Sequence, residues 1–167
     1  MGVGKVLALL AGLLTLIGTY VIAIYGVAGS YAGSGIGFIM NIPDLFANAD
    51  SYSALLSIEI WLFYILVIVF IIFLAAGLLQ IIFMKSRFLS IIFSLFPLGV
   101  SLMFLLLVYT DFLGIKSAFF ALFFIGEHYG SFYPIIVNVG ADLGLGVYLI
   151  LGGGALGLIS GFLPRED

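Results

Sequence analysis

The residues with the clearest chemical capacity lie in two short stretches of the C-terminal third. Glu127 and His128 are adjacent, and an imidazole beside a carboxylate can relay a proton or supply one ligand to a metal. Asn138 and Asp142 are four residues apart, so a helix would bring them to one face, where their oxygens could bind a cation. The alternative roles are a solvated loop position for His128 and, for Asp142, helix capping or surface placement.

None of these residues completes a catalytic site. His128 is the only histidine and the chain has no cysteine, so a zinc ion would take nearly all its other ligands from carboxylates. No Ser-His-Asp set, no catalytic pair of acids and no metal motif stands out. We therefore expect no enzyme activity, no cofactor and no metal centre.

The composition indicates a membrane protein. Hydrophobic residues make up 65% of the 167 residues and charged residues only 8%, against about 25% charged in soluble domains. The net charge is −3 and no basic run is present, which argues against a nucleic-acid partner. We expect a single membrane domain over residues 1–167, with membrane lipid as its surroundings.

Four apolar segments are long enough to cross a bilayer as helices. They cover about residues 6–27, 60–84, 88–109 and 138–163, which leaves outer loops at 28–59 and 110–137. The link Lys85-Ser86-Arg87 is so short that the second and third segments must form an antiparallel hairpin. The predicted fold class is all-α: an integral membrane four-helix bundle with short interfacial helices in the two outer loops, including one within 117–126.

Charge predicts the orientation. With both termini in the cytoplasm, Lys5, Lys85, Arg87 and Arg165 lie inside and only Lys116 lies outside. This distribution follows the positive-inside rule. The predicted localisation is therefore the cell membrane, as a multi-pass protein with cytoplasmic termini.

Small residues mark a packing face in the first and fourth segments. In the stretch LGGGALGLISG, residues 151–161, three glycines recur every four residues and so share one helix face. We expect this face to pack against the first segment of the same chain, and contact between chains is the alternative. The residues predicted to carry this packing are Ala8, Gly12, Gly146, Gly153, Gly157 and Gly161.

The third segment contains a proline near its middle. Pro97 lacks an amide hydrogen and crowds the preceding turn, which predicts a kink. Ser90, Ser94 and Ser101 lie near one stripe of this helix, where they can bond across helices or, alternatively, line a water path. Gln80, near the end of the second segment, is predicted to lie at the membrane interface.

The arrangement of the segments resembles that of four-pass (tetraspan) membrane proteins. Claudins and tetraspanins share the topology, and the opening GKVLALLAGLLTLIGTY is similar to that of uncharacterised archaeal four-pass membrane proteins. The chain lacks the Trp-Gly-Leu-Trp and paired cysteines of a claudin first loop and the Cys-Cys-Gly of a tetraspanin large loop. The resemblance therefore implies a topology and transfers no site residue.

Two functions remain open at this point. The first is a non-enzymatic membrane protein that acts by lateral association, as a structural or accessory subunit, a homo-oligomer or part of a larger membrane complex. The alternative is a small channel or transporter component for an ion or small solute. No predicted span carries a charge at its middle, which disfavours a pump or carrier.

Overall fold

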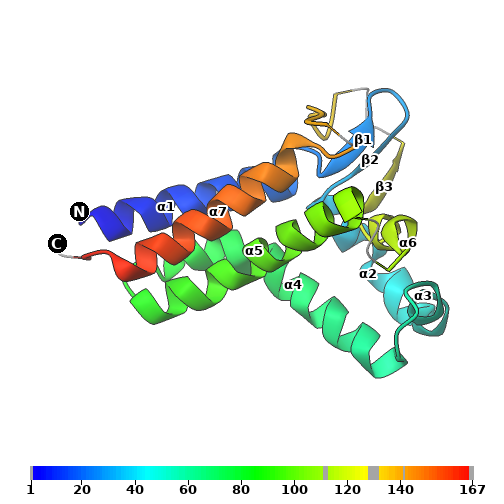
Figure 1. The fold of residues 1–167 in the computed structure, drawn as a ribbon, viewed down its shortest axis with the longest axis horizontal. Helices are drawn as coiled ribbons and strands as arrows, with labels where there is room; N and C mark the ends of the chain where they lie inside the picture. Colours follow the sequence, from blue (N-terminus) through cyan, green and yellow to red (C-terminus); the bar gives the residue numbers. More distant parts are fainter. Residues whose placement is uncertain (1, 111–112, 128–131, 141, 166–167) are drawn as a thin grey trace.

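Four long helices form the body of the protein. The computed structural model describes residues 2–110, 113–127, 132–140 and 142–165. All four helices are long and apolar enough to span a membrane, and both termini lie at the same end of the bundle (Figure 1), here called the terminal end. The helices are α1 (Val3–Leu16), extended by the π-helical turn η1 (Ile17–Val21), α4 (Ile60–Ile82), α5 (Arg87–Thr110) and α7 (Leu145–Phe162).

The helices pack in a closed ring of neighbours. α1 lies beside α7, α7 beside α5, α5 beside α4 and α4 beside α1. The antiparallel hairpin of α4 and α5 is confirmed, with only four residues, 83–86, between the two helices. The four-pass layout thus follows from the lengths of the apolar segments and the shortness of this link.

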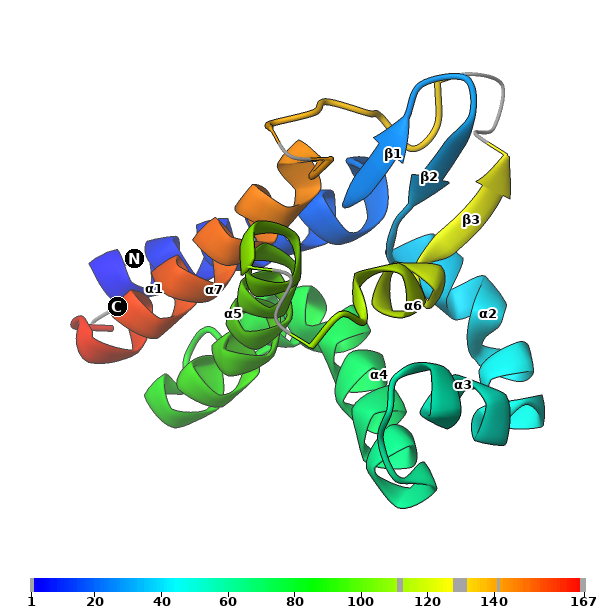
Figure 2. The ribbon, with the colours of Figure 1, turned by 45° about the vertical axis from the view of Figure 1, so that its right-hand side comes forward.

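The opposite end of the bundle carries a compact cap, which Figure 2 shows beside the open side of α4 and α5. A three-stranded antiparallel sheet, in the order β1-β2-β3, joins the two loops because β3 comes from the second loop and pairs with β2 of the first. The cap elements are β1 (Tyr25–Val27), β2 (Tyr31–Gly33), α2 (Gly35–Ala47), α3 (Ala49–Leu55), α6 (Lys116–Ala121) and β3 (Phe124–Glu127).

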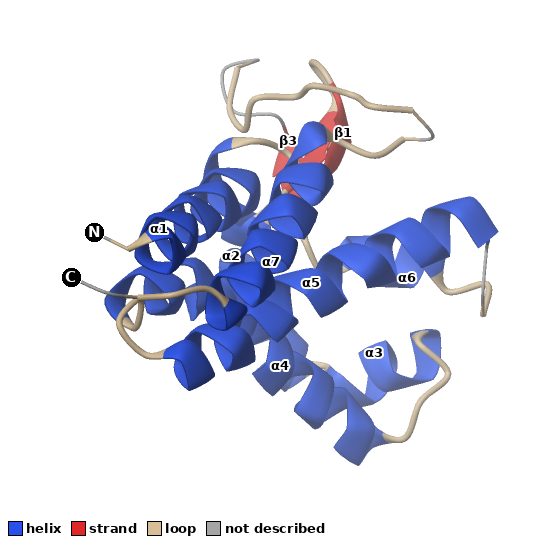
Figure 3. Ribbon diagram, turned by 60° about the vertical axis from the view of Figure 1, so that its left-hand side comes forward, coloured by secondary structure: helices blue, strands red, loops and turns tan. Residues whose placement is uncertain are grey.

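This sheet makes the all-α prediction wrong in part. The chain is mainly helical, as Figure 3 shows, but the strands are an essential part of the cap. Short helices do occur in both loops, as predicted, and each is packed into the cap. The Ser34 Oγ accepts a hydrogen bond from the Gly37 amide at 3.4 Å and so caps the start of α2.

The first and fourth spans are shorter at the cap end than predicted. The first ends at Val21 because the next residues are extended: the Ala23 amide donates to the Ile135 carbonyl at 2.9 Å. The fourth begins at Leu145, since the Gly144 amide donates to the Ile24 carbonyl at 2.7 Å. Backbone pairing between residues 22–24 and 135–144 therefore replaces the predicted helical turns.

An aromatic cluster fixes the cap on the bundle. The Phe123 side chain is fully buried, and its ring centroid lies 5.1 Å from that of Phe38, 5.2 Å from Phe70 and 5.1 Å from Phe104. Phe119 of α6 adds contacts to both α4 and α5. Both rings belong to the segment 117–126, which was predicted to lie at the membrane interface, and both are buried inside the protein.

Candidate functional site

A buried polar cluster joins all four long helices. The Gln80 side chain of α4 is fully buried, and its Oε1 accepts a hydrogen bond from Thr15 Oγ1 of α1 at 3.0 Å. Its Nε2 donates to Ser94 Oγ of α5 at 2.9 Å and lies 3.5 Å from the Gly153 carbonyl of α7. Gln80, which was predicted to lie at the interface, is thus enclosed by the bundle, and its amide bridges α4 to the other three long helices.

Gln80 is buried because small residues make room for it. A Cβ on Gly157 would overlap Ser94 Oγ and would lie 2.7 Å from Gln80 Nε2. An amide in an apolar bundle needs hydrogen-bond partners, and Thr15 and Ser94 provide them. The sequence signal for this position is Gly77, three residues before Gln80 and hence on nearly the same face of α4.

The serines of α5 are used inside the bundle. Ser94 Oγ donates to the Ser90 carbonyl at 2.6 Å, Ser90 Oγ lies 3.1 Å from Ser160 Oγ of α7, and Ser101 Oγ donates to the Leu98 carbonyl at 2.9 Å. All of these serines are buried. Their contacts favour bonding within and between helices over the water path. α5 continues through Pro97, and the kink there stays a prediction.

The predicted packing glycines contact different helices. A Cβ added at Gly153 would lie 2.7 Å from the Ala11 carbonyl of α1, and one added at Gly146 would lie 2.8 Å from the Gly18 carbonyl of η1. At Gly161, the Cβ would lie 2.7 Å from Ile91 Cδ1 of α5. The face expected to pack on the first span does contact α1 and η1, at Gly153 and Gly146, and it also contacts α5, at Gly157 and Gly161.

The small residues predicted in the first span lie on its buried side. A Cβ on Gly12 would come 2.7 Å from the Gly77 carbonyl, so this glycine faces α4 rather than α7. Ala8, one turn earlier, is fully buried. The close approach of α1 to α4 thus depends on Gly12 and Gly77 together.

Arg165 closes the terminal end of the bundle. This guanidinium is buried, and its Nη2 donates to the Ser160 carbonyl at 3.3 Å and to Ser160 Oγ at 3.2 Å. Its Nη1 donates to the Met84 carbonyl in the α4–α5 link. Desolvation, and secondarily the charge of Arg87, lowers the pKa of Arg165 below its usual range.

The polar residues predicted near the fourth span are not on a helix. Asn138 is exposed and pairs through its backbone with Gly144, and Asp142 occupies a turn with φ 67°. Gly144 is the N-cap of α7, so of the two roles predicted for Asp142, helix capping or surface placement, its exposed side chain fits surface placement. Asp142 forms an exposed ion pair with Lys116, at 3.6 Å between carboxylate and ammonium.

The predicted Glu127–His128 pair is only partly described. The backbone of Glu127 ends β3 opposite Tyr31. Its side chain and the whole of His128 lie outside the described residues. In the part of the chain that is described, no three His, Asp or Glu side chains gather in a way that would hold a metal.

A pocket of about 580 Å³ opens in the cap. α6 forms one wall with Phe120, whose ring stacks on Tyr25 with centroids 4.4 Å apart. Lys116 Nζ lies 5.8 Å from the centroid of the same Phe120 ring. Ser117 and Ala121 of α6 belong to the same wall. The remaining lining comes from the sheet, α2, α3 and the turn before α7: Tyr31, Asn41, Tyr52, Phe124 and Asp142.

An apolar groove lies between α4 and α5, which separate toward the cap (Figures 1 and 2). It has a volume of about 480 Å³ and adjoins a second apolar cavity of about 310 Å³. Gly99 lies in its wall, and a Cβ there would meet nothing within 4 Å. The two cavities share the lining residues Leu66, Val69, Met103 and Phe119.

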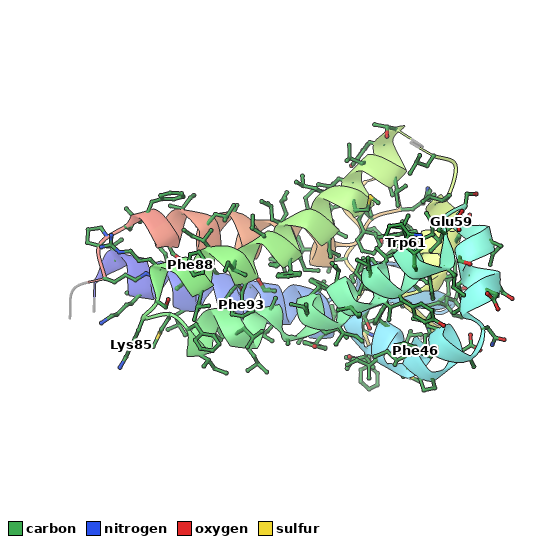
Figure 4. All side chains as sticks on the ribbon, turned by 90° about the horizontal axis from the view of Figure 1, so that it is seen from below. Phe46, Glu59, Trp61, Lys85, Phe88 and Phe93 are labelled. Atoms are coloured by element: carbon green, nitrogen blue, oxygen red, sulfur yellow. The ribbon has the colours of Figure 1, made fainter. Side chains whose placement is uncertain are left out.

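The large side chains outside the groove are also apolar. Trp61, Ile65 and Ile68 of α4 are 58%, 50% and 53% exposed and follow helical spacing, so they form one stripe. Figure 4 shows Trp61 and Glu59 at the cap end of α4 and Lys85 at the terminal end. The same helix therefore presents projecting apolar side chains and borders an open apolar groove.

Comparison with known proteins adds no family to this picture. No family model, no curated protein and no solved structure matches the chain. The four long apolar helices fit a four-pass topology, and no homologue supports the resemblance to claudins, tetraspanins or archaeal four-pass proteins.

Proposed function

We propose that this chain is a non-enzymatic, four-pass protein of the cell membrane that works by lateral association with a second copy of itself. The observation that carries the proposal is the groove between α4 and α5 beside the exposed Trp61–Ile65–Ile68 stripe. A two-fold axis would place the stripe of each copy in the groove of the other, which makes a self-complementary interface. In this role the protein is a structural membrane component.

The contacts of the small residues also favour α4 and α5 as the helices that bind the second copy. The glycine faces of α1 and α7 are occupied within the chain, so they are not free to bind a partner. Between α4 and α5, in contrast, an apolar cavity is unfilled. Helices in lipid associate through close packing, and an unfilled groove leaves such contacts unmade.

Association is tested by filling the groove. Gly99→Leu adds a side chain where the structure has free space, so the fold is expected to survive while the dimer weakens at least tenfold. The matched control is Leu10→Phe on the exposed side of α1. Native mass spectrometry of protein released from lipid nanodiscs measures the dimer fraction of each variant.

The outcomes separate the possible partners. A dimer lost in Gly99→Leu and retained in Leu10→Phe supports self-association. A lone monomer in the wild type contradicts the proposal. A complex containing a different chain also contradicts self-association and would make the protein an accessory subunit.

We further propose that the terminal end faces the cytoplasm. The antiparallel bundle gathers Lys5, Lys85, Arg87 and Arg165 at that end, whereas Lys116 belongs to the cap. The chain has no cysteine, so single cysteines report accessibility cleanly. In intact cells an impermeant maleimide should label Ser30→Cys in the β1–β2 turn and should leave Ser86→Cys unlabelled until the membrane is opened; the reverse pattern would refute this orientation.

A further inference from the structure

The cap pocket combines aromatic walls with polar atoms that have unused bonding capacity. Tyr25 and Phe120 stack at an interplanar angle of 20°, and Tyr31 is tilted by 49° against Tyr25. Together with Tyr52 and Phe124 they give the 580 Å³ pocket flat apolar surfaces. A pocket of this size with a few directed polar groups is typical of a small-molecule site.

Three polar side chains in this pocket keep capacity for a ligand. The Asn41 amide nitrogen donates to the Leu122 carbonyl at 3.2 Å and the Phe124 carbonyl at 2.9 Å, which holds its Oδ1 in place as an acceptor. No hydrogen bond within the described chain engages that Oδ1, the Tyr31 hydroxyl or the Ser117 hydroxyl. The site therefore offers one fixed acceptor and two hydroxyls that can both donate and accept.

The charge of the lining favours an uncharged ligand. Lys116 and Asp142 contribute one charge of each sign and are already paired at 3.6 Å. The Tyr52 hydroxyl donates to Asp44 Oδ2 at 2.6 Å, and this bond, with burial, raises the pKa of Tyr52 to about 12. Burial also raises the pKa of Tyr25. Both phenols are thus neutral at physiological pH, and the lining carries no net charge.

We infer that the cap pocket binds an uncharged saccharide ring. Sugar hydroxyls donate and accept at once, as do the hydroxyls of Tyr31 and Ser117, and the C–H face of a pyranose suits an exposed aromatic ring such as Phe124. A charged ligand would have to compete with the existing Lys116–Asp142 pair. The inference is independent of dimer formation because the pocket lies in the cap, on the side of α6 away from the groove.

Saturation-transfer NMR on the full chain in nanodiscs tests the inference. The probes are the methyl glycosides of glucose, galactose, mannose, fucose and N-acetylglucosamine, with glucuronate as the charged comparison, each at about 10 mM, a concentration that detects even millimolar binding. A parallel arm places diglucosyl diacylglycerol in the nanodisc. Binding of free glycosides indicates a soluble glycan as the source, and binding only of the glycolipid indicates a lipid headgroup.

Matched variants locate the site. Tyr31→Phe combined with Ser117→Ala removes two hydroxyls that make no hydrogen bond to the described residues, so it should leave the thermal unfolding temperature unchanged and weaken binding about tenfold. Tyr64→Phe, an equally conservative change at an exposed position of α4 outside the pocket, should not alter binding. Absence of binding to every probe, equal binding by the double variant, or tighter binding of glucuronate than of the neutral sugars would each overturn the inference.

Discussion

Replacing Gly157 by alanine is expected to lower the free energy of unfolding by about 2–3 kcal/mol, while the same change at Gly152 is neutral or stabilises by up to about 1 kcal/mol. The added methyl group at Gly157 would overlap Ser94 Oγ and press on Gln80 Nε2, and both of these side chains are fully buried. At Gly152 the nearest atom, Leu14 Cδ1, would be 3.9 Å away. The difference arises because only Gly157 faces the buried polar cluster.

The two alanine variants are compared by titration with SDS in mixed micelles, with helical circular dichroism as the signal. Gly157→Ala also displaces the Gln80–Ser94 hydrogen bond. Ser94→Ala should therefore destabilise the Gly157→Ala protein less than it destabilises the wild type. Equal unfolding free energies for Gly157→Ala and Gly152→Ala would refute the close approach of α7 to α5 at this position.

Phe123→Ala is expected to destabilise the protein by about 3–5 kcal/mol, the usual range for a fully buried phenylalanine. This ring lies within 5.2 Å, centroid to centroid, of rings from α2, α4 and α5, so its removal leaves a cavity where the cap meets the bundle. The measurement is the midpoint of thermal unfolding followed by tyrosine fluorescence in detergent. The cap should loosen first, because α1 and α7 do not contribute to this cluster.

Phe132→Ala is the control for this change. Phe132 also belongs to the second loop, but its side chain is 74% exposed. Phe132→Ala should lower the free energy of unfolding by no more than a typical surface substitution does, roughly 0.5 kcal/mol, and the unfolding midpoint should change correspondingly little. Comparable losses from the two alanine variants would mean that Phe123 lies in lipid rather than in the cap core.

The sequence was sufficient for the long helices because length and hydrophobicity alone determine them. The second and third spans end within two residues of their predicted limits, and the short Lys85-Ser86-Arg87 link left only a hairpin. The ends of the first and fourth spans were less predictable. Residues 22–27 are as apolar as the helix before them, and backbone pairing makes them extended: residues 22–24 pair with residues more than one hundred positions away, and residues 25–27 pair with β2.

The cap and the polar cluster required tertiary information. β1 and β2 have only three residues each, too few for an alternating pattern to be recognised. Gln80 lies five residues before Lys85, a position that a linear reading assigns to the membrane interface. Its burial depends on Thr15, Ser94 and Gly153, which come from three other helices.

The pairing of the first long helix with the last has a consequence for biosynthesis. The first long helix, α1 with η1, ends at Val21 and α7 ends at Phe162, so a ribosome needs on the order of 10 s to make the partner that α1 requires. Throughout that interval Ala11 of α1 and Gly18 of η1 lack the close contacts that Gly153 and Gly146 of α7 make with them in the complete bundle. Completion of the bundle is therefore a late event: a nascent chain that stops before Leu145 exposes an unfinished groove, which quality-control proteases of the membrane can recognise.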